Sequence, residues 1–162
     1  MKRTLTLLSL AVLSAGSALA HTSLQVQSAP AGSIYRGVLQ VPHGCGAAAT
    51  RTVRVRIPQE MYGVKPMPKP GWSLKTVSDD QGVREIVWSG GNLPSEWYDE
   101  FVFRGALDPD LKPGTALYFP AVQECRGSRA EWTDTSGHED AEFPAPRLTV
   151  TAAPAAPAGH HH

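Results

Sequence analysis

The stretch Thr52-Val53-Arg54-Val55-Arg56-Ile57 decides the fold class of this 162-residue chain. Val53, Val55 and Ile57 alternate with arginines, which is the two-residue period of a strand with one face in a core. Other short apolar or aromatic runs, bounded by Gly, Pro or Asp, lie at 24–26, 35–41, 85–88, 100–103, 116–122 and 148–151. No stretch of ten or more residues has a helical period. About seven short strands of this kind predict one all-β domain, an antiparallel β-sandwich.

The composition excludes several other classes of protein. An apolar fraction of 41% is enough for a core, while a charged fraction of 19%, with 15 Gly and 14 Pro, argues against a helical bundle or coiled coil. Four Trp, four Tyr and four Phe argue against a disordered chain. Basic and acidic residues balance at 15 each, so nothing indicates a nucleic-acid or membrane-surface partner. Phosphate-loop, nucleophile-elbow and paired-histidine motifs are absent, which disfavours hydrolases and nucleotide-binding proteins.

The first twenty residues have the pattern of a secretory signal peptide. Lys2-Arg3 is a basic start, residues 5–13 are apolar but too short for a membrane anchor, and Ala18-Leu19-Ala20 is a small-residue cleavage site. We therefore expect a signal peptide at 1–20 and a periplasmic or secreted mature chain that begins with His21. No later segment is long and apolar enough to span a membrane. Loss of the two basic residues leaves 13 basic and 15 acidic side chains.

Cys45 and Cys125 are the only two cysteines. An even number of cysteines outside the cytosol favours a disulfide, whereas a thiolate metal site would need the C-x-x-C spacing that is missing here. The Ala/Pro-rich segment 152–162 ends in three histidines and is expected to be disordered, which leaves 21–151 as the folded domain. The three histidines fit either a metal-scavenging end or the stub of an affinity tag.

The sharpest chemical feature is the histidine at the expected mature N-terminus. The α-amine and the ring Nδ1 of His21 can bind one metal ion together and close a six-membered chelate ring. An α-amine has a pKa of about 7.7–8, so it loses its proton to a metal at neutral pH at modest cost. Two nitrogen donors in this arrangement suit Cu(II). The pattern is that of a histidine brace, although a histidine also follows some cleavage sites by chance.

A brace needs further ligands, and the sequence offers several candidates. His43 lies two residues before Cys45, and His138 lies in an acidic loop; histidines in such places are more often structural or exposed than metal-bound. Glu100 begins an aromatic strand, where it is either a ligand or an edge carboxylate in water. Trp132 comes directly after Glu131 in an expected loop between strands, where it either caps a pocket or simply packs.

In order and spacing, a set of segments resembles the YcnI-like family of secreted copper-binding β-sandwich proteins. The resemblance covers nearly all of 21–150, and single segments of it are not specific. Its segments are His21 after the signal peptide, 41–46 (VPHGCG), 53–58 (VRVRIP), 64–66 (VKP), 70–72 (PGW), 93–94 (LP), 98–101 (YDEF), 117–120 (LYFP), 123–125 (QEC), Trp132 and 144–148 (PAPRL).

The resemblance implies a monohistidine brace for Cu(II). In that family the N-terminal histidine supplies its amine and imidazole, a glutamate supplies an oxygen, and a tryptophan lies close to the metal. His21 and Trp132 match the first and last of these positions. Glu100 is the predicted oxygen ligand, with Glu131 and Glu124 as alternatives.

We therefore expect an Ig-like antiparallel β-sandwich that binds Cu(II) in the periplasm or outside the cell. Its expected role is copper trafficking or homeostasis, without enzymatic activity, and its expected partners are the copper ion and copper-transport proteins. One alternative is an oxidative enzyme with a histidine brace, which would need a second imidazole, from His43 or His138, and a flat substrate surface. The other is a metal-free adhesion or carbohydrate-binding sandwich with Trp72, Trp97 or Trp132 as stacking platforms.

Overall fold

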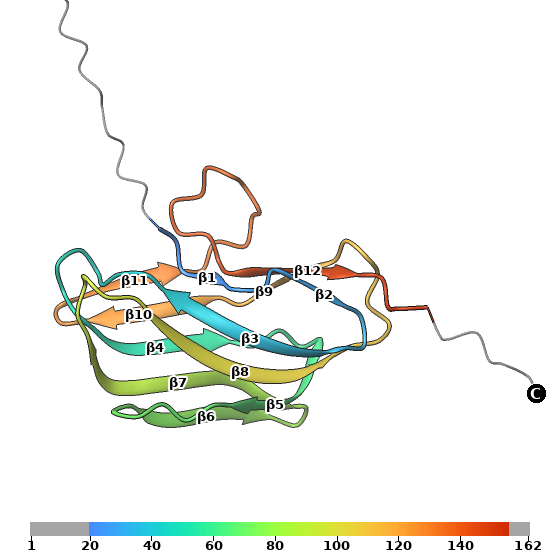
Figure 1. The fold of residues 1–162 in the computed structure, drawn as a ribbon, viewed down its shortest axis with the longest axis horizontal. Helices are drawn as coiled ribbons and strands as arrows, with labels where there is room; N and C mark the ends of the chain where they lie inside the picture. Colours follow the sequence, from blue (N-terminus) through green and yellow to red (C-terminus); the bar gives the residue numbers. More distant parts are fainter. Residues whose placement is uncertain (1–19, 156–162) are drawn as a thin grey trace, which may run out of the picture.

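Strands and turns, without a helix, make up residues 20–155, the part of the chain that the computed structural model describes (Figure 1). The strands are β1 (Ser23–Leu24), β2 (Ser28–Pro30), β3 (Ile34–Val41), β4 (Thr50–Arg56), β5 (Met61–Pro66), β6 (Ser73–Asp79), β7 (Gly82–Leu93), β8 (Asp99–Leu107), β9 (Ala116–Tyr118), β10 (Ala121–Cys125), β11 (Ser128–Trp132) and β12 (Arg147–Thr151). The predicted signal peptide before Ala20, and the end of the predicted tail at 156–162, lie outside the described residues. In the described part, no helix is long and apolar enough to cross a membrane.

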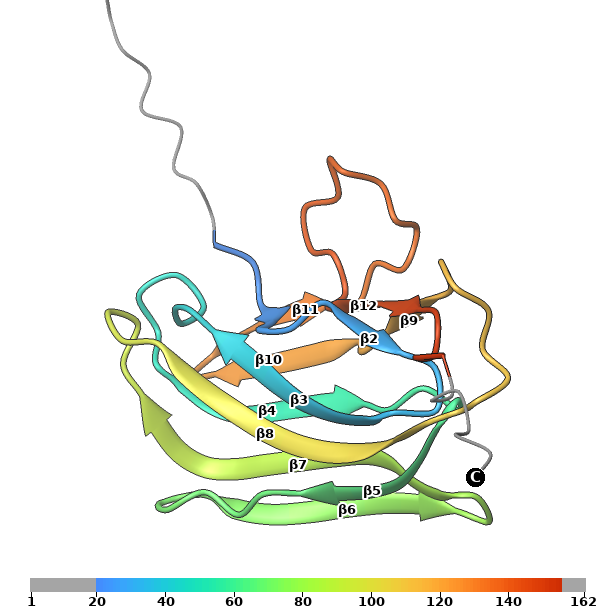
Figure 2. The ribbon, with the colours of Figure 1, turned by 45° about the vertical axis from the view of Figure 1, so that its right-hand side comes forward.

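The strands form three sheets, with the orders β1-β3-β8-β5, β11-β10-β4-β7-β6 and β2-β12-β9. All pairings are antiparallel except that of β12 with β2. The two larger sheets face each other, and the small sheet continues the molecule beside β1 (Figures 1 and 2). The predicted all-β, Ig-like antiparallel sandwich is confirmed.

The strand count exceeds the predicted seven, partly because one predicted strand is two. Residues 116–122 divide at Phe119-Pro120 into β9 and β10, which belong to different sheets. Pro120 has no N–H to donate to a strand ladder, so the backbone leaves one sheet there and enters the other.

The core lies between the two larger sheets. Val53, Val55 and Ile57 are buried as their alternation predicts. Beside them in the same sheet, Trp88 of β7 is fully buried and packs across the core against Phe101 of β8, with 5.4 Å between ring centroids. These large side chains hold the two layers at a fixed spacing, and the edges of the layers are therefore held in place as well.

Cys45 and Cys125 form the predicted disulfide. It joins the loop after β3 in one layer to the end of β10 in the other. The Cys45 backbone N–H also donates to Cys125 Sγ, with 3.2 Å between the two atoms. The loop 42–49 is thereby tied to the five-stranded sheet.

Removing this link destabilises the fold. We expect the double substitution Cys45→Ser and Cys125→Ser to lower the free energy of unfolding by up to about 4.5 kcal/mol, because a cross-link over a loop of 80 residues restricts the unfolded chain. Urea unfolding of the oxidised wild type and the double variant measures the difference. Equal midpoints and slopes for the two proteins would contradict the expectation.

Candidate metal centre

Two edge strands come together at the candidate site. β1 is the edge of the four-stranded sheet, and β11 is the edge of the five-stranded sheet. His21 lies two residues before β1, and Trp132 is the last residue of β11. Their ring centroids are 5.8 Å apart, with the ring planes tilted by 52°. The structure therefore brings together the two predicted site residues that lie farthest apart in sequence.

Trp132 is a strand residue, and its prediction as a loop residue is wrong. Its side chain is only 2% exposed. The indole packs against Phe143, with 5.3 Å between centroids, and Nε1–H donates to Oε1 of Gln123 at 3.3 Å. The indole is thus a fixed wall beside His21 and cannot swing into solvent.

The loop 133–146 between β11 and β12 stands out from the sandwich next to the N-terminal segment (Figures 1 and 2). His21 lines a hollow together with Asp134, His138 and Glu139 of this loop. The hydroxyl and the backbone N–H of Ser136 lower the pKa of the Asp134 carboxyl, so this carboxylate is ionised and already hydrogen-bonded within its own loop.

His43 also lies next to the N-terminal segment. Its ring lies 6.4 Å from that of Trp132, and the two residues line a second hollow together with Phe143. His43 Nδ1 lies 2.7 Å from the carbonyl oxygen of Gly44, and Nε2 lies 2.9 Å from the carbonyl oxygen of Ala20. Ala20 is the residue that the predicted cleavage removes, so the His43 ring points at the future chain start.

Gln123 connects His43 to Trp132, and it was not among the predicted site residues. Its side chain is 1% exposed. Nε2 donates to the carbonyl oxygen of His43 at 2.5 Å and to Thr50 Oγ1 at 2.6 Å, while Oε1 accepts from the Trp132 indole. The position of Gln123 could have indicated its role, because it lies two residues before Cys125 on the core side of a strand. A buried polar side chain there needs hydrogen-bond partners.

Glu100 lies in the four-stranded sheet, two strands away from β1. Ser23, Gln40 and Glu100 are directly paired across β1, β3 and β8, which separates the first from the last by about 10 Å. Glu100 Oε1 accepts from the Tyr98 hydroxyl at 2.9 Å and from Gln40 Nε2 at 3.4 Å. The hydrogen bond from the Tyr98 hydroxyl to Glu100 raises the pKa of Tyr98. Glu100 stays a predicted oxygen ligand.

The two alternative carboxylates are ion-paired elsewhere. Glu124 lies 2.8 Å from Arg54, and Glu131 lies 3.0 Å from Arg129. Each is the strand neighbour of a core-facing residue, Gln123 or Trp132, so it points to the opposite face of the five-stranded sheet.

The described chain carries Ala20 before His21, so the nitrogen of His21 is a peptide nitrogen here. Within residues 20–155, no three His, Cys, Asp or Glu side chains gather as a ready metal site. A brace takes two of its donors from one histidine, and its amine exists only after cleavage. Thr22 Oγ1, next to His21, is buried without a hydrogen-bond partner in the described part, so polar atoms at this point are not fully satisfied. Nitrogen donors around His21 fit Cu(II).

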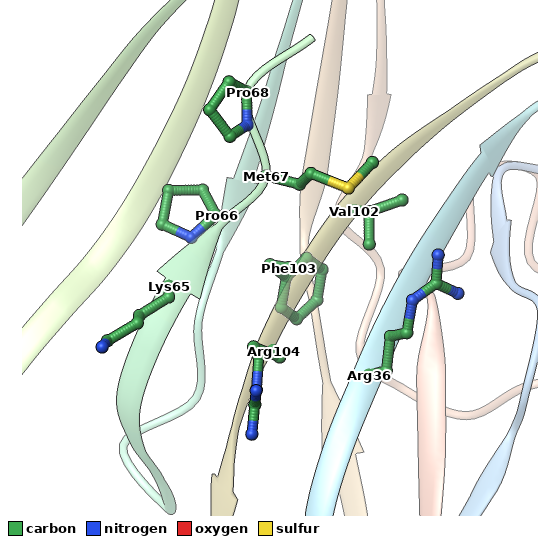
Figure 3. Close-up of a pocket in the computed structure, with 8 residues that line it drawn as sticks. All are labelled: Arg36, Lys65, Pro66, Met67, Pro68, Val102, Phe103 and Arg104. Carbon is green, nitrogen blue, oxygen red and sulfur yellow. The ribbon is translucent and has the colours of Figure 1, made fainter.

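A further hollow lies on the outer face of the four-stranded sheet (Figure 3). Arg36, Arg104 and Lys65 are directly paired across β3, β8 and β5 and form a row of three cations. In the described part none of the three forms a salt bridge. The apolar part of the same hollow is formed by Pro66, Met67, Pro68, Val102 and Phe103. This surface shares no residue with the site at Trp132.

The fold and the edge site define an Ig-like sandwich with an N-terminal histidine beside a buried tryptophan. Residues 21–150 match the family model described as "Domain of unknown function (DUF1775)", and the chain belongs to this family. This domain is that of the YcnI-like proteins, so the resemblance is confirmed at the level of the family. No curated protein matches the chain in sequence.

Solved structures support the fold. An uncharacterised protein from Nocardia farcinica with an immunoglobulin-like fold is 23% identical, with a TM-score of 0.68, over 82% of this chain and 99% of that one. A cohesin module of a family 33 glycoside hydrolase from Clostridium perfringens is 11% identical, with a TM-score of 0.54, over 82% of this chain and 97% of that one. At these identities the likeness concerns the fold alone.

The buried amide of Gln123 can be tested by a substitution of similar volume. We expect Gln123→Leu to lower the free energy of unfolding by about 1–3 kcal/mol, because it leaves the Trp132 N–H buried without a partner. Urea unfolding followed by tryptophan fluorescence measures the effect. Gln40→Leu is the matched control, since Gln40 is less buried and makes one long hydrogen bond. A cost for Gln123→Leu no larger than that of the control would contradict the role of this amide.

The row of three cations on the four-stranded sheet leads to a separate prediction. Like charges on directly paired strand residues repel, so we expect Arg104→Glu, which lies between Arg36 and Lys65, to raise the free energy of unfolding by about 0.5–1 kcal/mol. The gain should shrink at high salt. Lys75→Glu is the control, because Lys75 is an exposed strand cation that pairs with Val87. Equal effects of the two substitutions at low salt would argue against repulsion within the row.

Proposed function

We propose that this chain is a periplasmic or secreted Cu(II)-binding protein of copper trafficking or homeostasis, and that it holds the ion through His21 once residues 1–20 are removed. The observation that carries the proposal is the position of His21. The first residue of the predicted mature chain lies with its ring 5.8 Å from a buried indole, at the edge of a rigid sandwich. The family match begins at the same residue.

The surroundings of His21 suit an ion that is carried rather than kept. The α-amine and Nδ1 of His21 would supply a chelate, and Glu100 is the predicted oxygen donor. Trp132 and Phe143 form an apolar wall on one side, which limits the approach of water and of further ligands from that side. A copper ion with few protein ligands on an otherwise fixed framework can be passed to a partner with stronger donors.

An oxidative enzyme with a histidine brace is the second candidate, and His43 is the observation in its favour. Its imidazole approaches the N-terminal segment, as the facing histidine of such a brace would. Against it stands the loop 133–146, which rises beside His21 where a polymer-oxidising enzyme needs a flat face (Figure 2). In the presence of ascorbate and oxygen, a carrier should consume less oxygen than the same amount of free copper, whereas an enzyme should consume more.

The adhesion or carbohydrate-binding alternative loses two of its three platforms. Trp132 is buried, and Trp72 is partly buried and packs edge-on against Phe101. The expectation that these two are exposed stacking residues is therefore wrong. Trp97 is exposed, with 66% of its surface accessible. A single exposed tryptophan is a weak basis for glycan stacking.

The proposed function predicts that copper binding depends on the free N-terminus. We expect a form that starts at His21 to bind one Cu(II) ion tightly, and the same form with its α-amine acetylated to bind at least about tenfold more weakly, because the amine is then an amide. Both forms should end at Ala158, so that the terminal histidines cannot bind copper. Competition with a copper chelator gives the affinities. Equal affinities, or no tight binding by either form, would refute the proposal.

The same titration tests the oxygen donor. If Glu100 binds the ion, Glu100→Gln in the form that starts at His21 should weaken binding and change the Cu(II) EPR spectrum. If Glu100 only accepts hydrogen bonds from Tyr98 and Gln40, the affinity and the spectrum should stay as they are in the wild type.

A further inference from the structure

We propose that His43 supplies a third nitrogen, its Nε2, to the copper ion bound by His21. The site would then contain one amine and two imidazoles, where the family resemblance implies one imidazole. This inference rests on the proposed function, because it concerns the same ion. The inference differs from the proposed function in which residues bind the ion, and the experiment below distinguishes the two.

His43 lies close to the nitrogen of His21. His43 Nε2 lies 2.9 Å from the carbonyl oxygen of Ala20. That oxygen and the backbone nitrogen of His21 belong to one peptide group and are about 2.3 Å apart. Nε2 therefore lies within about 5 Å of the nitrogen that becomes the α-amine. Two nitrogens bound to one metal at about 2.0–2.1 Å each are separated by at most about 4 Å. A movement of about 1 Å brings both onto one ion.

The His43 ring is oriented with Nε2 toward the N-terminal segment. Both ring nitrogens of His43 face carbonyl oxygens, which only accept hydrogen bonds, so in the uncleaved chain either nitrogen can carry the proton. The predicted cleavage removes the Ala20 carbonyl and leaves the 2.7 Å contact with Gly44, which then favours the proton on Nδ1. A metal-binding histidine commonly donates its other ring N–H to a backbone carbonyl, which fixes the tautomer and the ring plane. In His43 this leaves Nε2 as the nitrogen for a ligand, and Nε2 is the atom that points at the chain start.

The loop that carries His43 is held firmly in place. Gln123 Nε2 donates to the His43 carbonyl, and the disulfide begins two residues later at Cys45. The Gly44 N–H donates to Ser95 Oγ at 3.2 Å, and a Cβ at Gly44 would collide with the carbonyl oxygen of Ala48. A loop held at three points in this way presents its imidazole in one place, as a ligand requires.

The other candidate ligands are placed less well. His138 lines the hollow beside His21, but it is exposed on the loop 133–146, and within the described residues its hydrogen bonds involve only its backbone: the N–H donates to Ser136 Oγ and the carbonyl accepts from the Ala141 N–H, each at 3.3 Å. Glu100 lies two strands from β1. His43 is the side chain whose ring is both fixed by hydrogen bonds and directed at the N-terminal nitrogen.

Cleavage then has two effects at the same point. It converts the His21 amide into an amine, and it removes the Ala20 carbonyl that faces His43 Nε2. In the uncleaved chain both donors are occupied, so the three-nitrogen site forms only in the mature protein. Copper loading is thereby confined to the compartment in which the signal peptide has been removed.

The test uses the form from His21 to Ala158, loaded with one equivalent of Cu(II). Pulsed EPR of the remote ring nitrogens counts the bound imidazoles, and chelator competition gives the affinity. We expect two imidazoles in the wild type and one in His43→Ala, with an affinity at least about tenfold lower. His138→Ala is the matched control and should keep two imidazoles and the wild-type affinity. The wild-type count requires no substitution, so a folding defect in His43→Ala leaves the test intact.

The outcomes separate this inference from the proposed function. Tight binding by the wild type with only one imidazole, unchanged in His43→Ala, would overturn the role of His43 and leave the copper-binding function standing. A second imidazole that disappears in His138→Ala would overturn it as well. Absence of tight binding by the wild type would instead refute the proposed function. Loss of one imidazole in His43→Ala alone supports the inference.

Discussion

The candidate site depends on one buried amide, the side chain of Gln123. Its N–H groups and its oxygen are shared among the His43 carbonyl, the Thr50 hydroxyl and the Trp132 indole. A buried primary amide without partners is costly, and one whose partners come from three separate segments fixes those segments relative to one another. The edge strand β11 and the loop after β3 therefore keep their places next to the N-terminal segment. The disulfide, two residues away, reinforces the same junction.

The candidate site lies at the sheet edges, where a β-sandwich is prone to pair with strands of other molecules. Edge strands have unpaired backbone groups that attract other strands, and β1 and β11 are edges of the two larger sheets. Here β1 is only two residues long, and the ring of Phe143 covers the indole at the end of β11. An edge protected by side chains in this way leaves a histidine accessible at the chain start without offering a long strand for pairing.

The sequence was sufficient for the features that depend on local pattern. Alternation in 52–57 predicted a half-buried strand, and the cysteine pair predicted the disulfide, because each signal lies in residue type and spacing. The place of Trp132 was missed, since a five-residue edge strand after a tight turn has little pattern of its own. The position of His43 could not be predicted, because it results from contacts across the two layers. Its neighbours in sequence carry no information about the Ala20 carbonyl, which lies 23 residues earlier.

Dependence on cleavage follows from how the donors are distributed. In the described part of the chain no three His, Cys, Asp or Glu side chains gather as a metal site, and the proposed copper site takes one of its donors from the backbone. A protonated amide nitrogen is a poor ligand and an amine is a good one, and under the proposed function cleavage before His21 would supply an amine next to the Trp132 indole and the hydrogen-bonded His43 imidazole. The framework around this nitrogen is complete beforehand, since strands, disulfide and Gln123 are independent of cleavage. A single bond-breaking step can therefore create the site without refolding the protein around it.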